Sequence, residues 1–466
     1  MHFEHEEEDR NLSLSKFESM LKTNKVLFFD SEEFEDIILH YLDMGKAALA
    51  KKALKLGLEQ HPKSTGLKLV QVEMLIYDDK LDQAEKMLNE LYAIEPTNEE
   101  IYIQKANIYS KRDKHETAVD LLKAALEFSD DHADIYNLIG MEYLFMDNLE
   151  LAKTNFIKCL EEDFEDQSGL YNVVYCFEFL DQNQEAIDYL KTYIEKNPYS
   201  EIAWHQTGRL YYGLKNYELA ATSFELATYI DEEFVGAFME RGKALERLKR
   251  YAEAIESYNQ TIELDDPTSY ALLRIGKCYE RLGNKVEALK YFNKTVHEDP
   301  LLDKGWIAIT DFYVRQKNHQ KALYYVNKAL AIDDQNRLYW KRFATINKAM
   351  NYIEESEYGY RKAVELGDFE LDTWLFWVDV MKEMGENNNG ILTLIQAAEY
   401  FPDQYQIEYR LAGFHFLLNE IEKGNFHLNN ALRLNTKNIS ILEELFPTVW
   451  DRESVQEYIA KHKKTK

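Results

Sequence analysis

The sequence predicts an all-α protein built from tandem repeats, on three observations. Proline and glycine, with 7 and 18 residues among 466, fall below their average usage of about 5% and 7%, which disfavours a sheet with many tight turns. Five of the seven prolines are separated by multiples of 34 residues, namely Pro62, Pro96, Pro198, Pro300 and Pro402. The same period relates Ala50, Ala84, Ala118, Ala152, Ala186, Ala220, Ala254, Ala288 and Ala322. Such a period is typical of an α-solenoid, in which each repeat packs on its neighbours.

Composition and charge narrow the class of protein. The chain has 83 acidic and 55 basic residues, a formal net charge of −28, and this excess of negative charge argues against general nucleic-acid binding. Hydrophobic residues make up 45% of the chain, too large a share for a disordered acidic polypeptide. Because a single core rarely exceeds about 250–300 residues, a chain of this length is expected to contain several domains or a repeat array.

The 34-residue register divides the chain into domains without any insertion. We predict an acidic tail and a capping helix over residues 1–30, twelve repeats over 31–438, and capping helices with a short basic tail over 439–466. The predicted repeats begin at Ser31, Thr65, Glu99, Ala133, Gln167, Glu201, Val235, Ser269, Asp303, Arg337, Leu371 and Tyr405.

The repeat that begins at Glu201 carries a recognisable pattern. Its key residues are Trp204, Gly208, Tyr211, Ala220, Phe224 and Ala227. This pattern resembles the tetratricopeptide repeat, W-x2-L-G-x2-Y followed by alanine, a large residue, a small residue and proline, although Thr207 replaces the leucine and Glu232 the proline. The resemblance implies a right-handed superhelical α-solenoid of stacked helix-turn-helix repeats.

The residues of this repeat also predict its two helices directly. Polar Lys215–Asn216 separates a helix over Ile202–Leu214 from one over Tyr217–Ile230. Each helix is marginal alone, so neighbouring repeats have to stack. A proline between repeats ends the second helix, because proline lacks an N–H group and disfavours helix at the residue before it.

Departures from the repeat pattern predict changes in packing. Small Gly140, Gly208, Gly242 and Gly276 share a column with the larger Ile38, Val72, Val174 and Val378. Wider helix spacing is expected at the larger residues. A local change of superhelical pitch is expected near residues 167–200, because bulky Tyr193 also replaces a small residue in repeat five. Glycine instead of alanine at 390 and 424 predicts a looser C-terminal end, since glycine costs about 1 kcal/mol inside a helix.

The terminal segments and the cysteines predict the cellular compartment of the protein. The acidic run Glu4–Asp9 is expected to be disordered, and Ser15 to cap a short helix. No secretory signal and no membrane span of about 18 apolar residues is visible. Cys159, Cys176 and Cys278 are odd in number and lack C-x-x-C spacing, which predicts neither disulfide nor metal. A cytoplasmic protein without a cofactor is expected.

No catalytic motif is visible in the sequence. G-x-G-x-x-G, G-x-x-x-x-G-K-[ST], G-x-S-x-G and H-E-x-x-H are all missing, although these are the common phosphate-binding, nucleophile and zinc motifs. The three cysteines fall at packing positions. We therefore predict that the protein is not an enzyme.

Function is expected on the face that the repeats leave exposed. The resemblance implies that the first helix of each repeat lines a concave face through its positions 2, 5, 6, 9, 12 and 13. In repeats one to five these positions hold Lys111 and the carboxylates Glu32, Glu35, Asp36, Asp43, Glu73, Glu100, Asp134 and Glu178. In repeats six to ten they hold Glu240, Glu246, Glu280 and Asp311 and a basic stripe, formed by Arg209, Lys243, Arg247, Arg274, Lys277, Arg281, Lys304, Arg315, Lys341, Arg342 and Lys348.

These features predict a non-enzymatic scaffold that binds an extended segment of a partner protein. Opposing charge is sparse along the basic stripe, so an acidic segment is the expected ligand there. An aromatic patch of Phe145, Tyr171, Tyr175 and Phe179 interrupts the acidic half and would supply anchors. Three alternatives stay open: a merely solvated face, occupation by the chain's own Glu4–Asp9, and RNA or another polyanion on the stripe, which the net charge disfavours.

Overall fold

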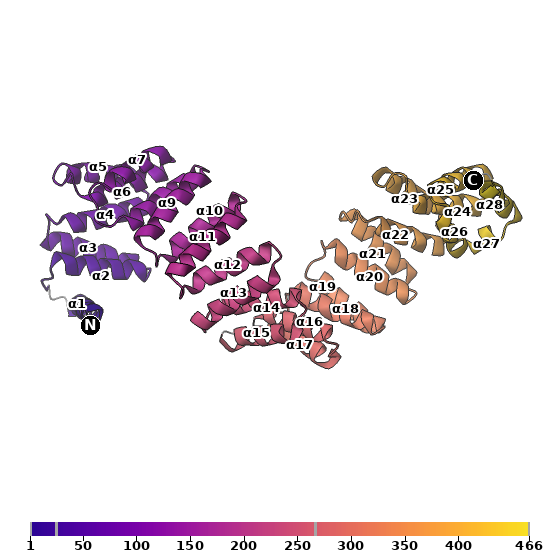
Figure 1. Ribbon diagram of the computed structural model, residues 1–466, viewed down its shortest axis with the longest axis horizontal. Coiled ribbons are helices and arrows are strands. Elements are labelled where there is room, and N and C mark those ends of the chain that lie inside the picture. Colours follow the sequence, from indigo (N-terminus) through magenta and orange to yellow (C-terminus); the bar gives the residue numbers. More distant parts are fainter. Residues whose placement is uncertain (1, 24–26, 265–267, 465–466) are drawn as a thin grey trace. The chain divides into compact units, whose positions relative to one another are not determined.

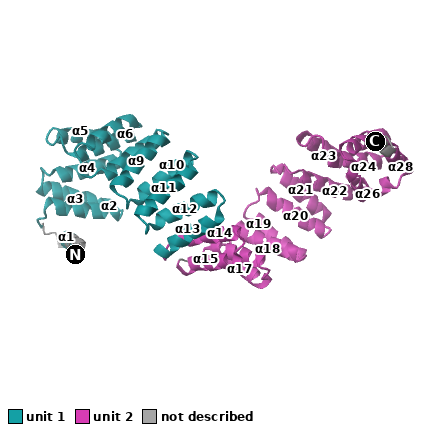
Figure 2. Ribbon diagram, in the orientation of Figure 1, with its two compact units in different colours: residues 1–231 teal, residues 232–466 magenta. Residues whose placement is uncertain are grey.

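The structure is a computed structural model that describes residues 2–23, 27–264 and 268–464, with side chains over 12–22, 27–264 and 268–461. These residues form twenty-eight α-helices and one short 3-10 helix, and no β-strand occurs among them. The chain divides into two compact units, unit 1 over residues 1–231 and unit 2 over residues 232–466 (Figure 2).

Unit 1 consists of helix α1 followed by six helical hairpins (Figure 1). Its helices are α1 (His2–Thr23), α2 (Ser31–Asp43), α3 (Ala47–Gln60), α4 (Thr65–Tyr77), α5 (Leu81–Tyr92), α6 (Glu99–Lys111), α7 (His115–Ala125), α8 (Ala133–Phe145), α9 (Leu149–Glu162), α10 (Gln167–Phe179), α11 (Asn183–Lys196), α12 (Glu201–Gly213) and α13 (Tyr217–Ile230).

Unit 2 consists of six further hairpins and three short terminal helices. Its elements are α14 (Val235–Arg247), α15 (Tyr251–Leu264), α16 (Ser269–Arg281), α17 (Lys285–Glu298), α18 (Asp303–Arg315), α19 (His319–Leu330), α20 (Arg337–Ala349), α21 (Ile353–Glu365), α22 (Leu371–Glu383), α23 (Asn387–Tyr400), α24 (Tyr405–Leu417), α25 (Ile421–Leu434), the 3-10 helix η1 (Thr436–Asn438), α26 (Ser440–Leu445), α27 (Pro447–Trp450) and α28 (Glu453–Lys464).

The repeat register is confirmed at every hairpin. Each first helix, from α2 to α24, begins at the residue that the 34-residue register predicts. In the repeat from Glu201, the two helices differ from their predicted bounds by at most one residue at either end. The all-α solenoid of stacked hairpins is therefore the observed fold.

A left-handed residue at repeat position 15 makes each hairpin turn. The φ angles lie between 56° and 80° at Gly45, Asp79, Asp113, Asp147, Asp181, Lys215, Lys249, Gly283, Lys317, Asn351, Gly385 and Asn419. The next residue closes the turn, as where the Asn216 N–H donates to the Tyr211 carbonyl at 2.9 Å, which is the Schellman arrangement at a helix C-terminus. One such residue at a fixed position explains why all the hairpins keep one length.

The core relies on small residues opposite aromatic rings. The alanine column is fully buried from Ala50 to Ala322. A Cβ atom added at Gly208 would lie 2.7 Å from the Phe224 ring, and one at Gly276 would lie 2.6 Å from Phe292. Glycine is required there because any side chain would collide with the ring.

Hairpins with a larger residue in the glycine column are packed differently. Where Val174 replaces the glycine, the ring position holds Leu190 instead of phenylalanine. The backbones of α10 and α11 in that repeat approach each other less closely than those of the glycine hairpins. The expected widening in repeat five is therefore confirmed.

The C-terminal end is not loosely packed, so the expectation based on glycine propensity is wrong. A Cβ atom at Gly390 would lie 2.8 Å from Phe414, and one at Gly424 would lie 2.5 Å from Phe416. Both rings belong to a large buried cluster that also includes Phe446 of the terminal segment. Glycine at these positions makes room for rings.

Both ends of the repeat array are covered by helices. Helix α1 begins at His2 and includes Ser15, so Ser15 does not cap it. Phe17 packs edge-on against Phe29 and Phe34 and covers the first repeat. The expected disorder of Glu4–Asp9 is wrong for the backbone, which is helical within α1. The side chains of these residues, and those of the basic tail beyond Lys461, lie outside the described residues.

Candidate partner-binding surfaces

The first helices of successive repeats lie next to each other within each unit, as α2 does with α4 and α16 with α18. Their positions 2, 5, 6, 9, 12 and 13 point to one side, and we call this surface the first-helix face. Unit 1 carries 46 acidic and 23 basic residues, whereas unit 2 carries 37 and 32. The two units therefore present this face in different electrostatic surroundings.

Most of the basic stripe is neutralised by carboxylates. Seven of its residues form ion pairs: Arg209–Glu178 (3.5 Å), Lys243–Glu240 (2.6 Å), Arg274–Glu246 (2.7 Å), Arg315–Glu280 (2.5 Å), Lys341–Glu370 (2.5 Å), Arg342–Asp311 (2.9 Å) and Lys348–Glu383 (3.5 Å). Five of these pairs join first helices of neighbouring repeats. The expectation that opposing charge is sparse along the stripe is wrong, because the carboxylates come from adjacent repeats.

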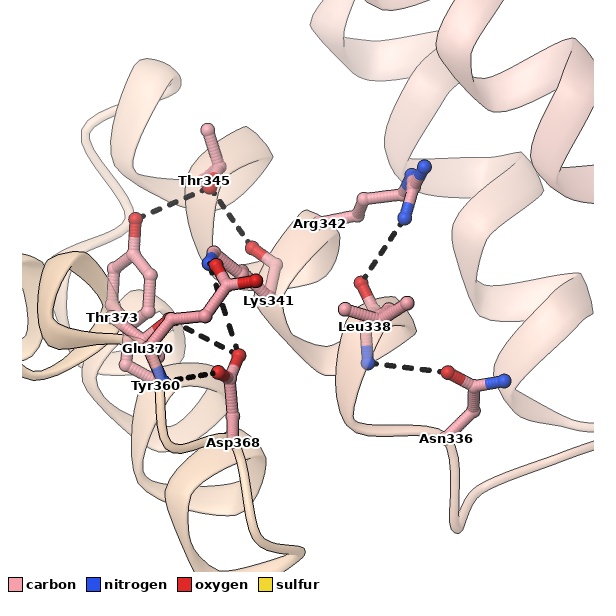
Figure 3. Close-up of polar contacts among 9 residues, drawn as sticks. All are labelled: Asn336, Leu338, Lys341, Arg342, Thr345, Tyr360, Asp368, Glu370 and Thr373. Carbon is pink, nitrogen blue, oxygen red and sulfur yellow. Dashed lines mark hydrogen bonds and ion pairs between the residues drawn. The ribbon is translucent and has the colours of Figure 1, made fainter.

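Lys341 illustrates how such a cation is held (Figure 3). Its ammonium lies 2.5 Å from Glu370 and 3.8 Å from Asp368. The Thr373 hydroxyl donates to Asp368 at 3.1 Å, which fixes that carboxylate. Lys341 therefore serves the packing between α20 and the start of α22.

Three stripe residues lack a counter-charge. Within the described ranges, the side chains of Lys277, Arg281 and Lys304 make no ion pair or hydrogen bond, whereas Arg247 is engaged in a contact of its own. Burial lowers the pKa of Lys277, and the charges of Arg274 and Lys304 add to this effect, whereas the charges of Glu246 and Asp311 oppose it without cancelling it. Lys277 is thus a half-buried cation that forms no ion pair of its own.

The acidic half of the face in unit 1 has few cations. Lys111 donates its ammonium to the Ile76 carbonyl at 2.7 Å and pairs with no carboxylate. Burial, together with the charge of Glu100, raises the pKa of Glu73. The pKa of Glu35 is raised by burial and by nearby Glu32 and Asp36. Carboxylates on this face therefore repel one another.

The aromatic patch lies on the surface of unit 1. Phe145, Tyr171, Tyr175 and Phe179 have between 40% and 65% of their surface exposed, so they are not core residues. The Tyr175 and Phe179 rings are 4.3 Å apart on α10. Phe145, on α8, stacks on His115 with 5.3 Å between ring centroids.

Sequence reasoning placed five of the seven partner carboxylates on this face but did not pair them with the stripe, and it missed Glu370, Glu383 and one buried pair. Arg410 Nε and Nη2 each lie 2.8 Å from a carboxylate oxygen of Asp379, and both side chains are buried. A sequence pattern could have indicated this pair. An acidic residue stands at position 9 of one repeat and an arginine at position 6 of the following repeat, as is also the case for Asp311 and Arg342. Exposed Tyr77, at the repeat position of Phe145 and Phe179, was missed as well.

The surroundings of the cysteines do not favour thiol chemistry. Burial raises the pKa of Cys159 and Cys278 to about 12 and that of Cys176 to about 11. A thiol with so high a pKa stays protonated and unreactive at neutral pH. Among the side chains that the structure describes, no His, Cys, Asp and Glu residues gather in a group suited to a metal ion. None of the described helices is both long and apolar enough to span a bilayer.

Comparisons with known proteins identify similarity to a repeat family and to a subunit of a complex. Models of the tetratricopeptide repeat family match residues 75–141, 133–166, 202–234 and 235–302. Anaphase-promoting complex subunit 3 of Schizosaccharomyces pombe is 22% identical over 159 residues, which cover 34% of this chain and 24% of that protein. The chain thus spans about a quarter of the length of this relative.

Two solved structures are also similar. The C-terminal part of a repeat protein from Cytophaga hutchinsonii is 16% identical, covers 59% of this chain and 98% of its own, and has a TM-score of 0.40. The hetero-tetramer Cut9–Hcn1 is 12% identical, covers 88% of this chain and 94% of its own, and has a TM-score of 0.38.

Proposed function

We propose that this chain, which is a tetratricopeptide repeat protein, is a scaffold that binds an acidic extended segment of a partner protein on the first-helix face of unit 2. One observation carries the proposal: the side chains of Lys277, Arg281 and Lys304 form no ion pair or hydrogen bond within the described residues, whereas seven other stripe residues are paired. The proposed binding surface therefore comprises only part of the basic stripe.

The physical reason lies in the cost of an uncompensated charge. A half-buried ammonium without an anion loses hydration and gains no ion pair, and this is why the pKa of Lys277 is lowered. A carboxylate on an incoming segment would restore the pairing through charge-assisted hydrogen bonds. Arg281, on the same helix, and Lys304, on α18, extend the binding surface to the next repeat.

The aromatic patch of unit 1 is proposed as a second contact surface. Exposed rings such as Tyr175 and Phe179 supply large rigid contact areas, which dominate many interfaces. The proposal assigns no catalytic step. It includes a cytoplasmic setting, because all three cysteines are free thiols.

A binding titration tests the acidic-segment proposal. The probe is a fluorescein-labelled peptide of four Glu-Ser-Gly units at about 0.15 M salt, close to physiological ionic strength. Reversing Lys277, Arg281 and Lys304 to glutamate should weaken binding about tenfold or more, since each lost charged hydrogen bond costs about 1.5–3 kcal/mol before solvent screening. The matched control reverses exposed Lys294, Lys317 and Lys328, which gives the same net charge.

The outcomes separate the alternatives. Equal affinity of the two triple variants would mean that only net charge matters and would overturn the proposal. A single-stranded RNA oligonucleotide is titrated in parallel. Tighter binding of RNA than of peptide, with a salt slope of about 0.7 per phosphate, would favour the polyanion alternative.

A further inference from the structure

The last residue of each first helix, at repeat position 13, differs in character between the units. In unit 1 it is aromatic and exposed in three repeats, at Tyr77 (83%), Phe145 (60%) and Phe179 (65%). In unit 2 the same position holds Arg247, Arg281 and Arg315. This position lies at the edge of the first-helix face, beside the hairpin turn.

The left-handed turn residue follows two positions later and is acidic in the same part of unit 1. It is aspartate in repeats two to five, at Asp79, Asp113, Asp147 and Asp181. All four side chains are exposed, and they make no ion pair or hydrogen bond with the rest of the described chain. We call Tyr77, Phe145, Phe179 and these four aspartates the aromatic–aspartate row.

Three features of the row favour a cation. The face of an aromatic ring attracts an ammonium or guanidinium group. An aspartate lies two residues from each ring, and the C-terminal end of a helix carries partial negative charge. The chain itself shows such binding, because Lys111 donates its ammonium to the Ile76 carbonyl at 2.7 Å, in the last turn of α4 beside Tyr77.

A pocket adjoins the row at Tyr77. It has a volume of about 230 Å³, and Leu42, Met74 and Tyr77 form its apolar lining. Glu73 contributes a carboxylate to it, whose pKa is raised by burial and by Glu100. The other carboxylate there, Asp78, is already paired with Lys51 at 2.8 Å. The pocket thus joins an apolar wall to an unneutralised acid, which suits a lysine or arginine side chain.

We infer that the aromatic–aspartate row binds a basic extended segment of a partner protein, with lysine or arginine at every third residue. Helices that pack side by side have axes about 8–10 Å apart, and an extended chain rises about 3.3 Å per residue. One basic residue in three can therefore meet the aspartate of one repeat after another, with a ring beside it in repeats two, four and five, whereas repeat three holds Lys111 at position 13. The net charge of unit 1, 46 acidic against 23 basic residues, steers such a segment toward it.

The inference deepens the proposed function, because it rests on Phe145 and Phe179 being partner contacts and names their ligand. That ligand has the opposite charge to the one proposed for unit 2. The two surfaces consequently bind different segments, and each can be removed without the other.

Two peptides of identical composition test the inference on the full chain. The first probe is a fluorescein-labelled peptide of four Lys-Ser-Gly units, and the second has its four lysines in one block. We expect the spaced peptide to bind several-fold more tightly. Replacing Tyr77, Phe145 and Phe179 by alanine leaves the charge unchanged, and the loss of three exposed cation–ring contacts should weaken binding of the spaced peptide roughly tenfold or more.

The control variant replaces exposed aromatic residues of unit 1 outside the row, Phe164, Tyr199 and Tyr229, and should bind as the wild type does. A second variant changes Asp79, Asp113, Asp147 and Asp181 to asparagine, which the left-handed turn tolerates. It should bind more weakly and with a smaller salt dependence. Its control, with the same change in net charge, neutralises exposed Glu90, Asp120, Glu161 and Glu162.

Two results would overturn the inference: undiminished binding of the spaced peptide by the three-alanine variant, or equal affinity for the spaced and the blocked peptide. The variant with Lys277, Arg281 and Lys304 reversed should keep its affinity for the lysine peptide. If the wild-type chain bound the spaced lysine peptide but not the Glu-Ser-Gly peptide, the unit 2 proposal would be contradicted. The inference for the aromatic–aspartate row would not be affected.

Discussion

Arg410 in unit 2 and Glu73 in unit 1 both occupy the first-helix face, and they differ in how their charge is used. Arg410 forms two hydrogen bonds of 2.8 Å to buried Asp379 of the preceding repeat. Glu73 pairs with no cation in the described part of the chain, and its pKa is raised by burial and by Glu100. The first charge holds repeats together, and the second is available to a ligand.

This difference shows that a count of charges along a face does not measure its binding capacity. The basic stripe has eleven residues, yet seven of them are in ion pairs, and five of these pairs join neighbouring repeats. Pairing across the repeat boundary decides which charges remain. Three experiments can break or sharpen this comparison.

The largest effect is expected at Arg410. Changing Arg410 to alanine leaves Asp379 buried without its partner and should lower the free energy of unfolding by about 3–5 kcal/mol. In unit 1, Arg209→Ala removes an exposed pair of 3.5 Å with Glu178 and should cost less than about 1 kcal/mol. Urea unfolding of both variants measures the difference. Similar losses would contradict the distinction between structural and available charges.

A second experiment asks whether packing, unlike charge, is the same in both units. Gly208→Val in unit 1 and Gly276→Val in unit 2 push a side chain into Phe224 and Phe292, and each should destabilise by about 1–3 kcal/mol. Adding Phe224→Leu or Phe292→Leu recreates the valine–leucine pair of repeat five and should recover part of the loss. Unequal costs in the two units, or no recovery, would show that the repeats are not equivalent in packing.

The smallest effect concerns the pH dependence of Glu73. A carboxyl whose pKa is raised in the folded state above its ordinary 4.5 holds its proton more tightly when folded, so stability falls as pH rises from 4.5 through the raised pKa. Because Glu73 is exposed and screened, Glu73→Gln should stabilise the protein at neutral pH by only about 0.2–0.5 kcal/mol.

Glu420 of unit 2 provides the opposite sign for the same measurement. Its pKa is lowered by the hydrogen bonds from His415 and Lys423, so its contribution is present above the unfolded pKa and is lost as pH falls through the lowered one. Glu420→Gln should therefore destabilise at neutral pH. Thermal unfolding of both variants between about pH 4 and pH 7 measures these effects. A change of the melting temperature in the same direction for both variants would contradict the comparison.

The fold could be predicted because its determinants are local and recur. A turn at position 15 and a small residue at position 20 of each repeat define the hairpins, and both are visible in one chain. The pairing of Lys341 with Glu370 depends on which carboxylate comes within reach of the ammonium, and the period does not encode this. Helix propensity similarly misjudged Gly390, because the ring that fills its space comes from Phe414 in the following repeat.

The turn residue at repeat position 15 has a consequence for protein engineering. Its backbone has to be left-handed, but its side chain points into water, as at Asp147 and Lys317. Aspartate, asparagine, lysine and glycine all occur at this position in the twelve repeats. Each unit therefore carries exposed turn positions whose charge can be changed one repeat at a time, which would alter the ligand preference of that unit while leaving the packing between its helices in place, except at Asn419, which accepts a hydrogen bond from Arg452.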